Sequence, residues 1–476
     1  MLFNSIEFLI FFTLVSFTYF IIPHRFRWML LLAASCYFYM AFVPIYILIL
    51  GFTIVIDYFA GILIENEQGK KRKLYLIMSL VANIGVLAIF KYYNFLNENL
   101  SLFLGLASVK NPMPYLSILL PIGLSFHTFQ AMSYTIEVYR GNQRAERHFG
   151  IYSLYVMFYP QLVAGPIERP QNLLPQLRQK FNFNYARVVE GLKLILWGIF
   201  KKLVIADRLA LYVNSVYNNA SHHNGTTLFL ATIFFSFQIY CDFSGYSDIA
   251  IGTARVMGFK LMTNFNRPYF AKNIAEFWKR WHISLSTWFK DYLYFSLGGS
   301  RVSIPRWYFN LFIVFLVSGL WHGANWTFII WGAINGCYII FSNITHPLQS
   351  RLSKIAWLSK YRGISQCIQI ISTFLMVSFA WIFFRANTIS DAFLIVRKIF
   401  TRPGSLFFEN SSMLIFSFAG IFFLLFAEIK KEYYKGKFSF LNNENWIVRY
   451  FSYATLIILI LLMGVFDGGQ FIYFQF

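Results

Sequence analysis

Long apolar runs recur along almost the whole chain, and they restrict the fold more than any other feature. The first run covers residues 3–22, and the next continues from residue 28 to residue 64. About 20 apolar residues in a helix cross the hydrocarbon core of a bilayer. Of the 476 residues, 58% are hydrophobic and 13% are charged, which is too little polar surface for a soluble protein of this length. We therefore predict an all-α protein that crosses the membrane many times.

Charge and proline divide the first runs into spans. Residues 3–22 lack a basic leader and a small-residue cleavage site, so we interpret them as a retained span and not as a signal peptide. Pro44 divides residues 28–64 into two spans, because the residue before a proline avoids helical geometry. A fourth span is predicted at residues 74–95, a loop at residues 96–114, and a fifth span at residues 115–136.

The basic residues predict the orientation in the membrane. Lys and Arg number 41 against 20 Asp and Glu, so the formal net charge is +21. The turns after the first, third and fifth spans are basic, whereas those after the second and fourth are not. Because basic loops stay in the cytoplasm, this alternation predicts an N-terminus outside it. The same charges could attract anionic headgroups or an anionic cytoplasmic donor.

The middle of the chain contains apolar segments that are too short to cross a bilayer. Residues 151–167 contain two prolines, and residues 192–205 are interrupted by two lysines. Such segments predict re-entrant or interfacial helices around a cavity, because irregular backbone at membrane depth needs a cover of protein or water. A span at residues 227–240 is predicted to end before the polar stretch at residues 242–248.

Residues 264–306 form the longest polar stretch. Within it, residues 276–288 alternate aromatic side chains with cations, which is typical of a helix in the headgroup layer. A basic loop is predicted at residues 346–362. The remaining spans are predicted at residues 308–321, 326–341, 367–384, 413–427 and 450–466.

These spans number about eleven, at roughly 20 residues each. We find no internal repeat and no separate soluble domain, so residues 1–476 are expected to form a single membrane-embedded domain. Residues 1–136 are its N-terminal five-span bundle, residues 137–345 its core, and residues 346–476 its C-terminal spans and an aromatic tail.

His322 is the first candidate for chemistry, because ionisable groups at membrane depth are costly and usually mark function. The alternative is a structural histidine that links helices. Gly319 and Gly323 would allow close backbone approach or a helix break, and Trp321 and Trp326 offer rigid aromatic walls. Asn325 is expected on the same helical face, where it could orient the imidazole or bind an oxyanion. We interpret His322 as a general base for acyl transfer to a hydroxyl.

His282 is the second candidate. It could simply face the headgroups. Alternatively, it lies at the entrance for an anionic thioester donor, lined by Trp278, Lys279 and Arg280. His127 is a third intramembrane histidine, and we expect it to line a cavity or to link helices.

Other polar residues carry weaker signals. Asp242 and Asp248 are six residues apart with no further ligand at metal spacing, so an N-cap or a polar cavity role is favoured and no metal site is predicted. The four cysteines show no CxxC spacing, which argues against disulfides and zinc. The C-terminal tail, residues 466–476, either forms an interfacial aromatic belt or folds back and presents Tyr473 to a site.

Several stretches together are similar to the membrane-bound O-acyltransferase (MBOAT) family, especially to its bacterial branch that acetylates alginate and peptidoglycan. The teichoic acid D-alanylation protein is a more distant relative. The resemblance rests on the tail and on residues 165–170, 242–248, 264–269, 277–286 and 319–323. It therefore covers most of the chain from residue 165 onward.

The resemblance implies a ring of helices around a central tunnel. His322 matches the family's catalytic histidine, and His282 matches its second signature position. Acetyl-CoA is the implied donor from the cytoplasm, no cofactor is bound, and an SGNH-type extracytoplasmic partner completes transfer to a polysaccharide. Tyr473 is a hypothetical acyl relay to that partner. The implied location is the bacterial cytoplasmic membrane.

Two further interpretations remain open. One is D-alanyl transfer to teichoic acid; the other is a transporter or scaffold without catalysis. A proton relay through the histidines is disfavoured, because inverted repeats are absent and carboxylates are scarce in the spans. The sequence does not name the polysaccharide, the partner, the acyl group or the oligomeric state.

Overall fold

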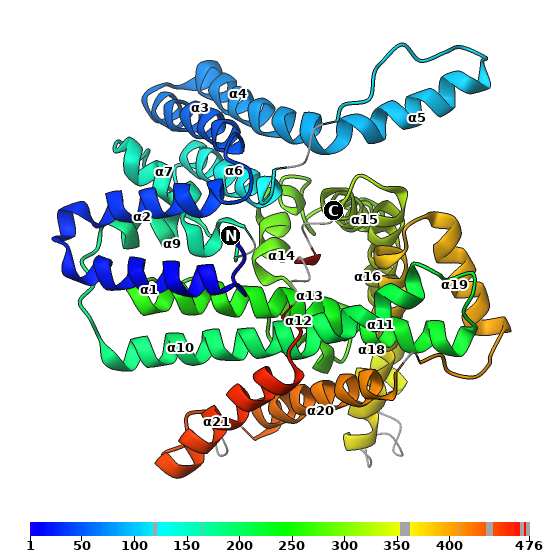
Figure 1. The fold of residues 1–476 in the computed structure, drawn as a ribbon. Helices are drawn as coiled ribbons and strands as arrows, with labels where there is room; N and C mark the ends of the chain where they lie inside the picture. Colours follow the sequence, from blue (N-terminus) through cyan, green and yellow to red (C-terminus); the bar gives the residue numbers. More distant parts are fainter. Residues whose placement is uncertain are drawn as a thin grey trace. The chain divides into compact units, whose positions relative to one another are not determined.

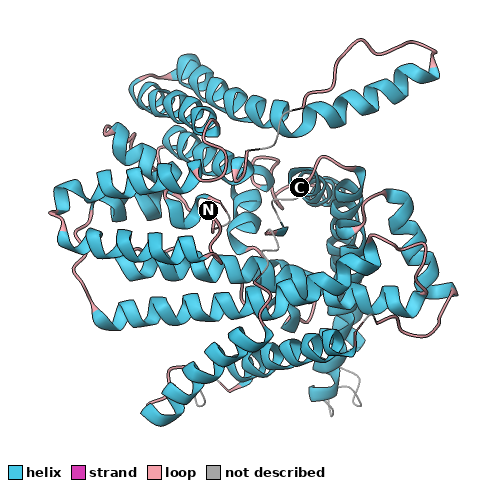
Figure 2. Cartoon of the chain, in the orientation of Figure 1, coloured by secondary structure: helices cyan, strands magenta, loops and turns pink. Residues whose placement is uncertain are grey.

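The part of the chain that the structure describes contains helices and no strands (Figure 2), which confirms the all-α prediction. This computed structural model describes residues 1–117, 121–163, 165–352, 362–408, 410–434, 441–466 and 471–472. The chain divides into two compact units. The first comprises Met1–Ile195 and Ile249–Met262, and the second comprises Leu196–Asp248 and Thr263–Phe476.

The helical elements follow one another along the chain (Figure 1). The elements up to the middle of the chain are α1 (Ile6–Ile21), α2 (His24–Met40), α3 (Tyr46–Asn66), α4 (Gly69–Leu87), η1 (Ala88–Tyr92), α5 (Tyr93–Leu106), α6 (Leu124–Arg140), α7 (Phe149–Met157), α8 (Tyr159–Leu162), α9 (Pro170–Arg178), α10 (Tyr185–Ile199), η2 (Phe200–Ala206), α11 (Asp207–Tyr217) and α12 (Gly225–Met257). The later elements are η3 (Pro268–Phe270), α13 (Ile274–Arg280), α14 (Ile283–Phe289), η4 (Lys290–Tyr294), α15 (Ile304–His322), α16 (Trp326–Leu352), α18 (Arg362–Arg385), α19 (Ile389–Thr401), α20 (Ser411–Tyr433) and α21 (Trp446–Met463).

Eight helical stretches among the described residues are long and apolar enough to cross a membrane, so this is a multi-pass membrane protein. They are Tyr46–Asn66, Gly69–Leu106, Gly225–Met257, Ile304–His322, Trp326–Thr345, Gly363–Arg385, Ser411–Tyr433 and Trp446–Met463. Helix α1 is apolar but has only 16 residues. The predicted number of about eleven is therefore not confirmed. One reason is α6, which begins only at Leu124, after Gly123 adopts a φ of 77°.

The predicted loop at residues 96–114 is wrong in its first part. Helix α4 continues through the π-helical segment η1 into α5, which ends at Leu106. Asparagines on α5 bond the extended segment that follows: Asn94 Nδ2 donates to the Leu116 carbonyl at 2.8 Å, and Asn97 Nδ2 donates to the Pro114 carbonyl at 3.2 Å. These asparagines lower the hydropathy of the stretch but lie in a helix, and their side chains hold the loop that follows it.

A polar cluster joins α3 and α4 in the first unit. The Asp57 carboxylate accepts hydrogen bonds from Ser79 Oγ at 2.6 Å and from Asn83 Nδ2 at 2.9 and 3.0 Å. All three side chains are fully buried. Because a carboxylate at membrane depth is costly without partners, this cluster links the two helices and resists their separation.

The two short apolar segments in the middle of the chain, residues 151–167 and 192–205, differ in whether the helix is broken. The break predicted within residues 151–167 is present, because α7 ends at Met157 and Pro160 lies in the single turn of α8. The helix predicted to break within residues 192–205 does not break there. Helix α10 runs into the π-helical segment η2 and on into α11, and η2 contains both lysines. A π-helical segment inside a longer helix often marks a functional site.

Helix α12 does not end at residue 240 but continues through Asp242 and Asp248, so the N-cap prediction for these aspartates is wrong. Their charges are matched by the lysines of η2. Lys202 Nζ lies 2.7 Å from Asp242 Oδ1, and Lys201 Nζ lies 2.7 Å from Asp248 Oδ2. The prediction that the helix ends at residue 240 failed because hydropathy treats each charged residue as isolated. In the fold, these charges lie in ion pairs.

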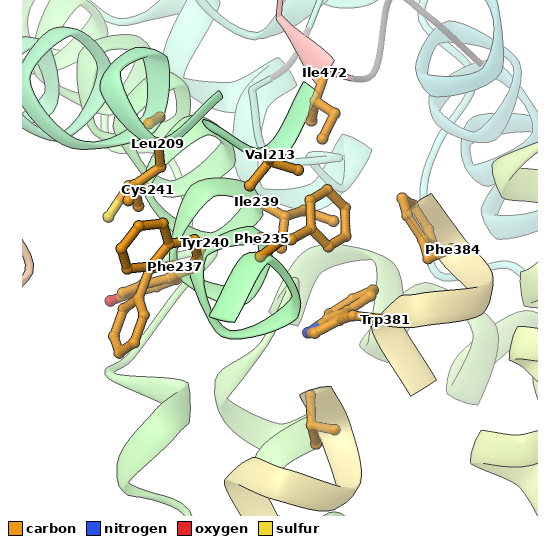
Figure 3. Packing of buried hydrophobic residues seen from close by; sticks show 14 of the residues in the cluster. Leu209, Val213, Phe235, Phe237, Ile239, Tyr240, Cys241, Trp381, Phe384 and Ile472 are labelled. Atoms are coloured by element: carbon orange, nitrogen blue, oxygen red, sulfur yellow. The ribbon is translucent and has the colours of Figure 1, made fainter. Parts of the chain in front are cut away.

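Aromatic side chains fill the core of the second unit (Figure 3). Trp381 and Phe384 of α18 face this core together with Phe235 of α12. The Trp381 ring stacks on the Trp331 ring of α16, with 5.5 Å between the ring centroids. Aromatic rings bury large areas in few rotamers, so this core gives its polar neighbours fixed positions.

Two later elements also differ from prediction. Helix α16 continues to Leu352, so the predicted basic loop at residues 346–362 begins as helix, and residues 353–361 lie outside the described part. Helix α19 has no counterpart among the predicted spans. It is tied to the second unit by Lys398, whose ammonium donates to the Ser221 carbonyl at 2.6 Å.

Candidate active site

His322 is the last residue of α15 and lies inside an aromatic enclosure. Its side chain is only 4% exposed. The centroid of its ring is 4.9 Å from that of Trp321, 5.0 Å from that of Trp331 and 5.4 Å from that of Phe384. Rigid rings on several sides hold the imidazole in one place and keep most water away from it.

Glycines explain how α15 and α16 come close enough to build this enclosure. A Cβ on Gly319 would lie 2.3 Å from the Phe328 carbonyl oxygen, and one on Gly332 would lie 2.4 Å from the Phe315 carbonyl oxygen. Neither position has room for a side chain. The predicted close backbone approach at Gly319 is therefore confirmed.

Asn325 does not share a helical face with His322, and that prediction is wrong. Helix α15 ends at His322 because Gly323 is extended, with φ −165° and ψ 149°. Asn325 lies in the turn that follows, where its Oδ1 accepts a hydrogen bond from the Thr327 N–H at 3.0 Å. Its side chain therefore supports the start of α16.

His282 has an unusual backbone conformation. It separates α13 from α14 with φ 42° and ψ 55°, in the left-handed region that residues other than glycine seldom adopt. The prediction of one headgroup-facing helix at residues 276–288 is wrong at this break, since Trp281 and His282 are each 1% exposed. A strained conformation of this kind costs about 1–3 kcal/mol and often occurs at functional sites.

Asn264 holds the imidazole of His282. Asn264 Oδ1 lies 3.1 Å from His282 Nδ1 and also accepts from Ser284 Oγ at 2.9 Å, while Asn264 Nδ2 donates to Ser247 Oγ at 3.1 Å. Because the amide oxygen can only accept, His282 Nδ1 carries the proton in this pair and the lone pair of the neutral ring is on Nε2. Burial lowers the pKa of His282 to about 3, which keeps the ring neutral.

Sequence reasoning did not identify Asn264 as a site residue. It lies 18 positions before its partner, and no helical or strand spacing connects the two. The only signal was its place in the polar stretch at residues 264–269, one of the stretches that resemble the family.

Trp321 contacts both His282 and His322. Its ring centroid lies 6.3 Å from that of His282 and 4.9 Å from that of His322. Trp278 is connected to His322 through Trp331. The ring centroids of Trp278 and Trp331 are 5.8 Å apart, and the Trp331 ring also contacts that of His322. Two imidazoles, one indole between them and further rings around them form the candidate site.

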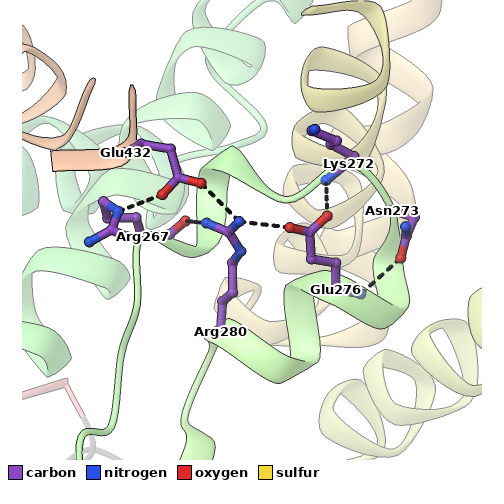
Figure 4. Close-up of polar contacts among 6 residues, drawn as sticks. All are labelled: Arg267, Lys272, Asn273, Glu276, Arg280 and Glu432. Carbon is purple, nitrogen blue, oxygen red and sulfur yellow. Dashed lines mark hydrogen bonds and ion pairs between the residues drawn. The ribbon is translucent and has the colours of Figure 1, made fainter. Parts of the chain in front are cut away.

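The two predicted donor-binding cations differ in their surroundings, and Figure 4 shows those of Arg280. Arg280 is already ion-paired, with its Nη2 2.7 Å from Glu276 and 2.9 Å from Glu432. Glu432 also pairs with Arg267 at 2.6 Å. These contacts tie α13 to α20. Lys279, by contrast, is exposed.

His127 belongs to the first unit. It is 1% exposed, and its Nε2 lies 2.9 Å from Thr53 Oγ1, so it joins α6 to α3. The first unit also contains a pocket of about 240 Å³, lined by His24, Arg25, Trp28, His148, Ile151, Leu177 and Arg178. No predicted site residue lines that pocket, and we take the aromatic enclosure of His322 as the candidate site.

The C-terminal tail folds back into the second unit where it is described. Phe471 and Ile472 are 0% and 4% exposed, so the interfacial-belt alternative is wrong for these two residues. The Phe471 ring lies 5.6 Å from that of Phe243, which in turn lies 4.5 Å from that of His282. Tyr473 lies outside the described residues.

Known proteins resemble this chain across most of its length. It is 37% identical over 399 residues to a peptidoglycan O-acetyltransferase of Helicobacter pylori, covering 77% of this chain and 72% of that protein. It is 37% identical over 410 residues to the "Probable alginate O-acetylase AlgI" of Pseudomonas aeruginosa, covering 84% and 75%. A teichoic acid D-alanyltransferase of Bacillus subtilis is 27% identical over 277 residues, covering 55% and 68%. The sequence model of the MBOAT family matches residues 146–385, a range that includes His282 and His322. The chain therefore belongs to the membrane-bound O-acyltransferase family and is an acyltransferase.

Proposed function

We propose that this acyltransferase takes an acetyl group from cytoplasmic acetyl-CoA and passes it across the membrane for O-acetylation of a cell-envelope polysaccharide. The observation that carries the proposal is the contact of His282 and His322 with the same indole, Trp321, inside a buried aromatic enclosure. The names of the relatives from H. pylori and P. aeruginosa support acetyl transfer to an envelope polymer.

In this proposal His322 is the general base. Its imidazole removes the proton of an acceptor hydroxyl while the hydroxyl oxygen attacks the thioester carbonyl carbon. A C–O bond forms, the C–S bond breaks, and the thiolate leaves with the proton that the imidazolium returns. The enclosure by Trp321, Trp331 and Phe384 supports this role, because it fixes the ring and excludes water that would hydrolyse the thioester.

His282 acts at the donor side. Its Nδ1–H is committed to Asn264, so Nε2 is the atom that can accept a proton or a hydrogen bond from the reacting groups. Lys279 is exposed and remains the proposed contact for the anionic donor. Arg280 supports the site indirectly in this scheme, because its pairing with Glu276 and Glu432 positions α13.

Acetyl transfer is tested with purified protein in liposomes. The wild-type protein is expected to consume acetyl-CoA in the presence of an acceptor and without an ion gradient, which separates an enzyme from a transporter. His322→Ala, verified as folded by its elution in size-exclusion chromatography, is expected to lose at least about a thousandfold in kcat, the range of a lost general base together with its positioning. A folded His322→Ala protein with normal turnover would falsify the catalytic assignment.

The remaining steps are proposals about the tail and a partner. Tyr473 receives the acetyl group on its hydroxyl and passes it to an SGNH-type partner outside the cytoplasm. The docking of Phe471 and Ile472 next to Phe243 supports a tail that reaches the site. Replacing Tyr473 by Phe is expected to abolish envelope ester acetate while acetyl-CoA binding is kept. Unchanged envelope acetate in that strain would rule the relay out.

D-alanyl transfer to teichoic acid is the second candidate, favoured by the B. subtilis relative. Ester-linked groups released from the envelope of a deletion strain distinguish the two. Loss of acetate supports the first proposal, and loss of D-alanine supports the second. We also propose that the protein lies in the bacterial cytoplasmic membrane, as its relatives suggest. The basic loops support an N-terminus outside the cytoplasm, and a reporter enzyme fused to the N-terminus tests that orientation.

A further inference from the structure

Two residues near the C-terminus are fixed inside the second unit. The Ile472 N–H donates a hydrogen bond to Asp242 Oδ2 at 2.7 Å. The Phe471 ring packs against the Tyr246 ring with 4.3 Å between centroids. Both residues are buried. A buried backbone N–H is costly without an acceptor, and Asp242 supplies that acceptor for Ile472.

The acceptor of that hydrogen bond is itself held by charge. Lys202 Nζ lies 2.7 Å from Asp242 Oδ1 and 2.8 Å from Asp207 Oδ1, and all three side chains are buried. One carboxylate oxygen of Asp242 therefore faces Lys202, and the other receives the backbone of Ile472. A hydrogen bond to an ionised acceptor is about twice as strong as a neutral one. Burying three charged groups costs desolvation free energy. The hydrogen bond that Asp242 accepts from the tail is a function that would explain why this buried cluster is kept.

The docked segment also touches the candidate site through one ring. Phe243 follows Asp242 in α12, and its ring lies 5.6 Å from that of Phe471 and 4.5 Å from that of His282. Removing the tail would take away one side of the packing around Phe243. The ring that contacts His282 would keep its contact with Phe265 at 5.0 Å but lose the one with Phe471, so it would be held less firmly.

We propose that Asp242, held by Lys202 and Asp207, is a positioning residue that latches the C-terminal tail against Phe243 and thereby fixes the wall of the acyl-transfer site at His282. The consequence for activity rests on the proposed function. The latch itself does not, and its test needs no turnover.

Thiol labelling of the full-length protein in membranes measures the latch directly. The four native cysteines are replaced by alanine, and Ile472→Cys is introduced, which keeps the backbone N–H. We expect slow reaction with a maleimide in this parent, because the position is 4% exposed. Asp242→Ala is expected to raise the labelling rate about tenfold or more, since it removes an ionised acceptor.

Asp248→Ala is the matched control. Asp248 lies on the same helix and pairs with Lys201 at the same 2.7 Å distance, whereas the Ile472 N–H donates to Asp242. Labelling in this variant is expected to remain at the parent rate. If Asp242→Ala does not fold, Asp242→Asn keeps the shape and one acceptor oxygen, and a roughly fivefold rise is expected. Equal labelling of parent and Asp242 variants, or equal opening by Asp248→Ala, overturns the latch.

Kinetics of the same variants test the positioning role. Opening of the tail should lower kcat for acetyl transfer about tenfold or more and leave KM for acetyl-CoA unchanged, because the donor does not need the tail to bind. An opened tail with unchanged kcat overturns the positioning role. His322→Ala in the labelling parent should abolish transfer while the thiol introduced at position 472 stays protected, so failure of the latch and failure of the proposed function give different results.

Discussion

The hydrogen bonds of Asn264 allow a quantitative prediction about His282. Asn264 Oδ1 interacts with His282 Nδ1 at 3.1 Å, with the Ser284 N–H at 3.3 Å and with Ser284 Oγ at 2.9 Å. Asn264→Ala removes the acceptor from three buried donors at once. Each buried donor left without a partner costs about 1–3 kcal/mol.

The free energy lost in Asn264→Ala lowers both the stability of the fold and the catalytic rate. His282 is held at φ 42°, a conformation worth about 1–3 kcal/mol of strain, and without Asn264 the backbone and ring can relax. If about 2 kcal/mol is lost from the placement of the imidazole in the transition state, kcat falls about 30-fold, because 1.36 kcal/mol corresponds to a factor of ten. KM for the donor should change much less, since the interaction orients a ring and does not bind the substrate.

Steady-state kinetics in liposomes measure this effect, with Asn266→Ala as control because that side chain is exposed on the same segment. Asn264→Asp keeps an acceptor oxygen toward His282 and should recover most of the lost kcat. It should also shift the pH profile, because a carboxylate beside the ring raises the pKa of His282. A kcat of Asn264→Ala within twofold of wild type would refute the reasoning.

Three other features lead to tests of stability. Gly319→Ala should destabilise the protein by about 1–3 kcal/mol, because its Cβ would lie 2.3 Å from a backbone oxygen. A Cβ at Gly85 would have no atom within 4 Å, so Gly85→Ala is the control and should melt like wild type in detergent. Glu432→Gln should lower the free energy of unfolding by about 1–3 kcal/mol, a value between those of exposed and buried ion pairs. The reason is that Arg267 and Arg280 lose the carboxylate that they share. An unchanged Tm would contradict this. Burial lowers the pKa of His282 to about 3, so the unfolded chain binds a proton that the folded chain excludes, and stability should fall as the pH drops below about 6.5. His282→Asn should flatten that slope, and an identical pH dependence of both proteins would count against it.

Local sequence was sufficient for much of the helix layout. The helices α1, α2, α3, α15 and α18 follow from runs of apolar residues, because a helix satisfies its own backbone hydrogen bonds in lipid. Of these, α3, α15 and α18 contain stretches that are long and apolar enough to cross a membrane. The turn at Pro44 and the break at Pro160 follow from the backbone limits of proline. His322 could be recognised for a similar reason, since a lone imidazole beside glycines in an apolar run is conspicuous by itself.

Charges and turns, by contrast, depend on contacts between distant segments. Hydropathy predicts that a helix ends before Asp242, yet α12 continues because Lys201 and Lys202 lie opposite Asp248 and Asp242. Helical spacing predicts Asn325 on the face of His322, yet α15 ends at His322 itself. The partners of the two aspartates lie in another segment, and no local pattern contains them.

The candidate site divides in the same way. Composition and spacing were enough to establish that the chain lies in a membrane, that its elements are helices, and that His282 and His322 are unusual, because these depend on the solubility and spacing of neighbouring residues. Helix packing determines that Trp321 touches both rings, that Asn264 sets the proton of His282, and that Ile472 returns to Asp242. Several of these contacts join residues far apart in the chain, and their energy depends on burial and distance, which exist only after the helices have packed.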